Sequence, residues 1–288
     1  MPTRRQFTFQ LAGTTLSVAA LAACRDLEPA DDSGGHALDS TDTGADSADT
    51  AESGDTSDTG TSHGWATGGT AGMSAEYPDP FTDDASTECA LFCEMTLGPC
   101  YAQTIERQDI SEGVTGLPTR LAIRVVDDAC NPVAGAIVDI WHCAPGGLYS
   151  GEDANEVCTE GDAAAIAGRW FRGMLTTDAE GRVDFNTCFP GWYPGRAVHI
   201  HIQIRKGEDT WSTSQLFFDE ALIADVYTTH PEYVGYGVPD RKNVGDGVLA
   251  GADPAPFVVE SARMEDGSLQ VWKTVVIRSS LSEQSCAV

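Results

Sequence analysis

Seven residues, from Val198 to Ile204, alternate strictly between apolar and polar side chains. Because successive side chains of a β-strand point to opposite faces, this run predicts a strand that places Val198 and three isoleucines on one face. His199 and His201 then share the other face, where two imidazoles are able to bind one metal ion. A polar sheet face that is exposed to water is the alternative interpretation of the same pattern.

Short apolar runs bounded by Gly, Pro, Asn and Asp recur through the rest of the chain and are typical of strands joined by turns. They are residues 121–126, 136–143, 174–177, 182–187, 198–205, 211–218, 257–264 and 269–277. We expect 174–177 and 182–187 to form one hairpin and the last two runs to form another. Short helices are expected after Asp219, as an N-cap, and around 89–93. Many short strands and few helices predict an all-β fold, either a β-sandwich or a barrel.

The start of the chain has a different character. Arg4 and Arg5 precede an apolar stretch that ends at Leu21-Ala22-Ala23-Cys24, which resembles a twin-arginine export signal with a lipid-attachment cysteine. That resemblance implies removal of residues 1–23 and a lipid on Cys24. The mature protein would then be exported to the cell envelope, on its periplasmic or cell-surface face, and would touch a membrane only through this anchor.

An acidic low-complexity segment follows the export signal. Between Arg25 and Ala75 there are eleven Asp or Glu residues and one Arg, among many Ser, Thr, Gly and Ala. Such a segment buries too little apolar surface to offset the entropy of ordering it. We therefore predict a disordered tether over 24–75 and a folded domain over 76–288. The net charge of the whole chain, -27 from 44 acidic and 17 basic residues, argues against a nucleic-acid partner.

The cysteines fit an exported domain. Of nine in the chain, one is the lipid-attachment residue, and the other eight are Cys89, Cys93, Cys100, Cys130, Cys143, Cys158, Cys188 and Cys286. An even number in an oxidising compartment predicts up to four disulfides, in an arrangement that the sequence alone leaves open. A zinc or iron–sulfur site is the alternative, although the chain has no Cys-x-x-Cys pair.

A stiff loop leads into the predicted histidine strand. Its sequence, Pro190-Gly191-Trp192-Tyr193-Pro194-Gly195-Arg196, favours sharp turns and brings a phenol and a guanidinium up to the start of that strand. Such a loop is able to aim Tyr193 into the site of His199 and His201. A packed corner is the alternative role for a tyrosine between two prolines.

Together these segments resemble the intradiol ring-cleavage dioxygenase family. The resemblance rests on Gly147-Leu-Tyr149-Ser-Gly151, on Phe189 to His201 and on Gln215-Leu-Phe-Phe218. The framing segments Gly98-Pro-Cys-Tyr101 and Val138 to Cys143 fit the exported branch of the family. The match covers residues 88–230, and the ordered set of Tyr, Tyr and His-x-His is its most specific part. The resemblance implies a β-sandwich of the protocatechuate-dioxygenase-like type, with short helices and long loops.

The resemblance also implies a site. A non-haem Fe(III) would be held by Tyr149 and His199 as equatorial ligands and by Tyr193 and His201 as axial ligands. Tyr193 would leave the metal when substrate binds and act as a base. Arg196 would lie near the substrate, and Gln215 would lie behind the ligands. The implied reaction is cleavage of a catechol-type ring by O2, between the two hydroxylated carbons, to a cis,cis-muconate-type product.

Two other functions remain open at this stage. The runs 121–126 and 136–143 also resemble transthyretin-like β-sandwiches, which would make the chain a non-catalytic binding module of the envelope. Alternatively, His199 and His201 could hold copper or zinc, with both tyrosines serving only as packing residues. The particular catechol or hydroxyquinol, the disulfide pairing and the oligomeric state are not specified by the sequence.

Overall fold

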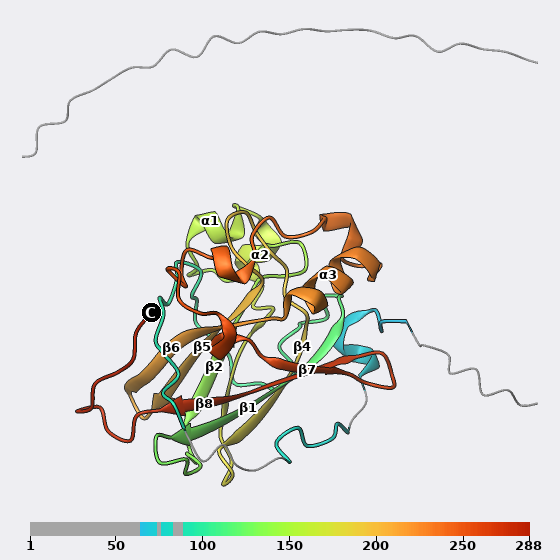
Figure 1. Ribbon diagram of the computed structural model, residues 1–288. Coiled ribbons are helices and arrows are strands. Elements are labelled where there is room, and N and C mark those ends of the chain that lie inside the picture. Colours follow the sequence, from blue (N-terminus) through green and yellow to red (C-terminus); the bar gives the residue numbers. More distant parts are fainter. Residues whose placement is uncertain (1–63, 74–75, 83–88) are drawn as a thin grey trace, which may run out of the picture. The chain divides into compact units, whose positions relative to one another are not determined.

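A computed structural model describes residues 64–73, 76–82 and 89–288 (Figure 1). The strands are β1 (Pro118–Asp127), β2 (Ile137–Trp141), β3 (Arg172–Thr176), β4 (Arg182–Cys188), β5 (His199–Lys206), β6 (Asp209–Phe217), β7 (Glu260–Arg263) and β8 (Leu269–Ile277). The helices are α1 (Glu156–Thr159), α2 (Ala163–Ala167) and α3 (Glu220–Thr229), with 3-10 turns η1 (Gly69–Gly72), η2 (Val234–Tyr236), η3 (Asn243–Gly245) and η4 (Ala255–Phe257). In Figure 1 the three α-helices gather at one end of the strands.

Two four-stranded sheets make up the domain, in the orders β4-β1-β8-β7 and β3-β2-β5-β6. One continuous hydrophobic core contains residues from both sheets, such as Leu121 and Val271 from the first and Ile140 and Ile202 from the second. The fold is therefore a β-sandwich with short helices, as the family resemblance implied, and of the two folds that the strand pattern left open it is not the barrel.

The alternation in β5 has the predicted effect on burial. Ile200, Ile202 and Ile204 are buried in the core between the sheets, and burying one such side chain stabilises the fold by about 1.5–3 kcal/mol. The opposite face is buried as well, because His199 is 2% exposed and His201 is 1% exposed. A water-facing polar surface at this position was the wrong interpretation.

One predicted hairpin does not form. Strand β3 pairs with β2, with Leu175 opposite Val138, whereas β4 pairs with β1, with Phe185 opposite Leu121. The segment 178–181 therefore carries the chain from one sheet to the other. Its turn is held by the Asp178 carboxylate, which accepts from the backbone of Glu180 and Arg182. Turn residues specify where a chain reverses, but they do not specify which neighbour the next strand pairs with. The second predicted hairpin, β7 with β8, does form.

Of the two predicted helices, only the one after Asp219 is present. The Asp219 carboxylate accepts from the backbone N–H groups of Ala221 and Leu222, which caps α3. Residues 89–93 are irregular instead, because this segment pairs with other parts of the chain. The backbone N–H of Phe92 donates to the Val276 carbonyl at 2.9 Å, and that of Glu94 donates to the Cys286 carbonyl at 2.7 Å.

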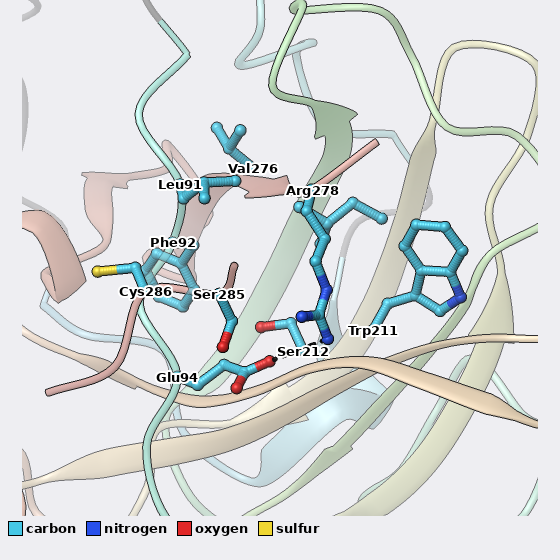
Figure 2. Close-up of a pocket in the computed structure, with 10 residues that line it drawn as sticks. Leu91, Phe92, Glu94, Trp211, Ser212, Val276, Arg278, Ser285 and Cys286 are labelled. Carbon is cyan, nitrogen blue, oxygen red and sulfur yellow. Dashed lines mark ion pairs between the residues drawn. The ribbon is translucent and has the colours of Figure 1, made fainter. Parts of the chain in front are cut away.

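The C-terminal segment is fixed beside β8 at this place. Figure 2 shows Phe92, Glu94, Arg278 and Cys286 around a small pocket, with an ion pair between Glu94 and Arg278 at 3.9 Å. A disulfide links Cys93 to Cys286. Two others link Cys89 to Cys130 and Cys100 to Cys158. Cys143 and Cys188 are buried free thiols, so the fourth possible disulfide does not form.

Residues 64–73, which we assigned to the tether, pack onto the domain. The Trp65 indole N–H donates to Asp225 at 3.1 Å, and the Arg263 guanidinium lies over the same ring. The Ala66 N–H donates to the Gly267 carbonyl at 2.9 Å. Apolar contact around Trp65 offsets the entropy of ordering this stretch, which its small polar neighbours alone would not do. The rest of the predicted tether up to residue 63 and the export signal at 1–23 lie outside the described residues.

Within the described part of the chain, none of the helices combines the length and the apolar character that crossing a membrane requires.

Candidate metal centre

The four predicted metal ligands converge in the second sheet. Strand β5 places the Nε2 atoms of His199 and His201 3.2 Å apart. The Tyr149 Oη atom lies 3.4 Å from His199 Nε2, and the Tyr193 Oη atom lies 3.3 Å from it. Two phenol oxygens and the His201 nitrogen therefore gather around His199 Nε2. Of these four residues, only Tyr193 is partly exposed.

The loops that carry the two tyrosines pack against each other through glycines. Gly147, two residues before Tyr149, has a φ of +90°, and a Cβ there would overlap the Trp192 carbonyl oxygen. A Cβ at Gly191, two residues before Tyr193, would overlap the Ala144 carbonyl oxygen. Only glycine allows this close approach of two backbones. The Gly-x-Tyr sequence at both positions therefore has a structural reason.

The two histidines are held differently. His199 Nδ1 lies 2.7 Å from the Ala197 carbonyl oxygen and donates to it, which leaves the lone pair of Nε2 facing the phenols. The His201 ring stacks on the Trp141 indole. Burial, reinforced by the Arg196 charge, lowers the pKa of His199 to about 3. Burial, followed by the influence of His199, also lowers the pKa of His201 well below its usual value. Both imidazoles are thus neutral and able to donate lone pairs near neutral pH.

Burial raises the pKa of the two tyrosines, whereas it lowers that of the histidines. It raises the pKa of Tyr149 well above 10 and also raises the pKa of Tyr193, while the Arg196 guanidinium partly counteracts the latter effect. Each phenol is therefore neutral until a cation replaces its proton. Buried Arg172 lies behind this centre, with its guanidinium 5.8 Å from the centroid of the Tyr149 ring.

The other two predicted site residues, Arg196 and Gln215, also lie here. Arg196 Nη1 donates to Tyr193 Oη at 3.3 Å, and Nη2 donates to the side-chain oxygen of Gln215. Gln215 sits opposite His201 on β6, and its Nε2 donates to the Thr96 carbonyl at 3.2 Å. All six residues that the sequence analysis assigned to the site are therefore close together.

One residue of this cluster was missed. The Asp246 carboxylate accepts from Arg196 Nε at 2.9 Å and is fully buried. It follows β6 and α3 in the chain and belongs to a loop without a recognisable motif. The sequence contains no local signal that would have placed it beside Arg196.

The donor set fits a hard cation. Over residues 64–73, 76–82 and 89–288 there is no metal-binding cluster of three or more His, Cys, Asp or Glu side chains. The candidate ligands are instead two neutral imidazoles and two phenols. Each phenol oxygen lies within hydrogen-bond distance of His199 Nε2, so both tyrosines join the histidine pair that a copper or zinc site would use.

Comparisons with known proteins agree with this geometry. A protein-family model described as Dioxygenase matches residues 91–236. A solved structure of an intradiol ring-cleavage dioxygenase from Tetranychus urticae superposes with a TM-score of 0.58 and 29% identity, covering 66% of this chain and 95% of that one. The chain belongs to the intradiol ring-cleavage dioxygenase family. Membership does not favour the transthyretin-like binding module.

Curated relatives in this family are chlorocatechol 1,2-dioxygenases of Pseudomonas. The chain is 29% identical to the Pseudomonas putida protein over 159 residues, which is 49% of this chain and 56% of that relative. A second Pseudomonas relative matches at 29% identity over 165 residues, which is 59% of its length. The chain therefore spans somewhat more than half of these dioxygenases. The matched family segment contains all six predicted site residues but not Asp246.

Proposed function

We propose that this chain is a non-haem Fe(III)-dependent intradiol dioxygenase. It would cleave a catechol-type ring with O2, between the two hydroxylated carbons, to a cis,cis-muconate-type diacid. The observation that carries the proposal is the convergence of the Tyr149 and Tyr193 oxygens on the His199 and His201 nitrogens. The curated relatives, named as chlorocatechol 1,2-dioxygenases, support a catechol-type substrate.

The donor set supports iron in its ferric state. Tyr149, Tyr193, His199 and His201 would hold the ion, and two hard, anionic phenolates favour Fe(III) over softer or less charged metals. When bound, Fe(III) would supply the Lewis acidity and redox chemistry that make an aromatic diol reactive toward O2. Trp141 and the buried sheet face would exclude water from the His201 side of the centre.

Tyr193 is the proposed base. Both tyrosines lie on loops, and of the two phenols Tyr193 alone is partly exposed. Its Oη atom would accept the proton of a catechol hydroxyl when the substrate takes its place. Arg196, which donates to the same oxygen, would then stabilise the phenol or the negative charge that develops on the substrate ring. Gln215 would hold Arg196 at that position.

We also propose that the protein is exported and anchored in the cell envelope through Cys24. Three disulfides in the folded domain support an oxidising compartment, because such bonds do not persist in a reducing cytosol. Metabolic labelling with a radioactive fatty acid would test the anchor. Label should appear in the parent chain and be absent from a Cys24→Ala variant.

The activity is tested with the purified full chain from iron-replete cells. We expect about one iron per chain, a red colour from charge transfer between tyrosinate and Fe(III), and O2 consumption with catechol that yields a ring-opened diacid. Tyr149→Phe should lose iron and activity, whereas Tyr77→Phe should keep both, because the Tyr77 hydroxyl bonds to Ser268, next to β8 of the first sheet. A colourless, iron-free and inactive protein would contradict the proposal and favour a binding module.

A further inference from the structure

The Asp246 carboxylate accepts hydrogen bonds from one guanidinium and two backbone N–H groups. Both of its oxygens accept from Arg196 Nε, at 3.1 and 2.9 Å. One oxygen also accepts from the Ala197 N–H at 2.8 Å, and the other from the Val248 N–H at 2.9 Å. The Asp246 side chain is 0% exposed, so these groups replace its hydration completely. A buried carboxylate of this kind requires a charged partner, and Arg196 is that partner.

The segment that carries Asp246 is joined to the Tyr193 loop at three places. The Trp192 indole N–H donates to the Gly237 carbonyl at 3.1 Å, the Gly195 N–H donates to the Asp240 carboxylate at 3.1 Å, and Asp246 binds Arg196. The same segment is also bound to the end of β6, because the Asn243 side chain donates to the Phe218 carbonyl at 2.8 Å. Residues 237–248 therefore link the end of β6 to the loop that carries Tyr193 and Arg196.

Fixing Arg196 at Nε also fixes the direction of its other two nitrogens, because a guanidinium is planar and rigid. Nη1 then faces Tyr193 Oη and Nη2 faces Gln215 Oε1. Without the Asp246 carboxylate, the arginine stem would be free to rotate, and the partly buried charge would turn toward solvent. The orientation of Arg196 thus depends on a residue that lies outside the matched family segment.

We propose that Asp246 is a positioning residue for Arg196 and that residues 237–248 complete the candidate active site. The effect on catalysis rests on the proposed dioxygenase function. Asp246 hydrogen-bonds to none of the four candidate ligands in the described structure, and the side chain that it binds there is Arg196.

The first experiment is steady-state kinetics of Asp246→Asn in the full, iron-loaded chain. Asn keeps the shape and one acceptor oxygen, but it places an NH2 group or a neutral oxygen against the guanidinium. We expect kcat for catechol to fall at least about tenfold, as for a misplaced catalytic group, with KM and iron content close to those of the parent. Asp253→Asn is the matched control, because Asp253 is an exposed acid in the following turn whose carboxylate accepts from the Ala255 N–H at 3.0 Å.

A merely structural role is separated from positioning by repeating the substitution in an Arg196→Ala background. If Asp246 acts through Arg196, Asp246→Asn should lower kcat no further there, since no guanidinium remains to be oriented. Losses that multiply in the double variant would overturn the proposal, and so would full turnover in Asp246→Asn alone.

A second measurement needs no variant and no turnover. The Nε–H proton of Arg196 should exchange slowly with water in an NMR experiment on the nitrogen-15-labelled parent chain, because it is held by a buried carboxylate. Fast exchange would overturn the proposed positioning even if the chain proves to be a dioxygenase. Slow exchange in a chain without ring-cleaving activity would instead contradict the proposed function, while it would still support the ion pair between Arg196 and Asp246.

Discussion

The Trp141 indole and the His201 imidazole lie nearly parallel, with ring centroids 4.9 Å apart and 7° between the planes. No described protein group hydrogen-bonds to His201 Nδ1, whereas His199 Nδ1 donates to a carbonyl. The direction of the His201 ring is therefore set by packing. Gly98 adjoins the same ring, because a Cβ at that position would lie 2.9 Å from His201 Cε1.

Gly98→Ala should accordingly weaken metal binding. The added methyl group would push the His201 ring out of line, and loss of support for a metal-binding histidine typically costs about 10- to 100-fold in metal affinity. Iron retention during dialysis against a chelator measures the effect. Gly113→Ala is the control, because Gly113 has a nearly identical φ of +77° but open space around the Cβ position. Equal iron retention in both variants would contradict the packing argument.

Arg196→Ala should reduce turnover while iron stays bound. The guanidinium lies at Tyr193 Oη, where it would stabilise developing negative charge, and removal of one such donor typically costs about 2.7–4 kcal/mol, or about 100- to 1000-fold in kcat. Kinetics and iron analysis on the same preparation check this. An unchanged kcat would exclude an electrostatic role for Arg196.

His142 should make the stability of the domain fall in mild acid. It is fully buried between Thr187 and the Cys143 carbonyl, and burial lowers its pKa to about 4. Because the unfolded chain has the higher pKa, about 6.5, protonation favours unfolding, and the stabilisation present above about pH 6.5 is lost as the pH falls toward 4.

Urea unfolding at two pH values measures this effect. Between about pH 7 and pH 5, the free energy of unfolding of the parent should decrease by about 2 kcal/mol more than that of a His142→Gln variant, which cannot titrate. Identical decreases in the two proteins would show that His142 does not carry the effect.

The Cys93 and Cys286 disulfide should account for a large part of the stability. It joins positions 193 residues apart and fixes the C-terminal segment beside β8 (Figure 2). Its removal by Cys286→Ala should lower the free energy of unfolding by about 2–5 kcal/mol. Cys93→Ala and the double variant should unfold at the same Tm as Cys286→Ala, because each removes the same link. A Tm equal to that of the parent would contradict this prediction.

The strands were predictable because their signal is local. In β5 the order of apolar and polar residues is enough to predict an extended segment and the face that packs in the core, and in β6 and β8 it predicts the extended segment. Pairing is not local, and the Asp178 turn looked like a hairpin although its strands belong to different sheets. Residues 89–93 were similarly misassigned, since their conformation depends on the distant partner Cys286.

The residues of the candidate site also differ in how well local sequence predicted them. His199 and His201 followed from alternation within one strand, and the loop before that strand pointed to Tyr193 and Arg196. Tyr149 and Gln215 came from resemblance to a family. Asp246 came from neither, because it is 50 residues from Arg196 and lies beyond the matched segment. Contacts formed by loops that are distant in sequence leave no periodic trace in the residues that form them.

The disulfide between Cys100 and Cys158 has a consequence for how the protein matures. The Cys158 carbonyl accepts from the Tyr149 N–H at 3.0 Å, and the Cys100 carbonyl accepts from Arg172 behind the same tyrosine. Both walls around the Tyr149 phenol are therefore joined by one oxidisable bond. A newly made chain in which these thiols are still reduced lacks this link, so we expect oxidative folding to help order the segments around Tyr149.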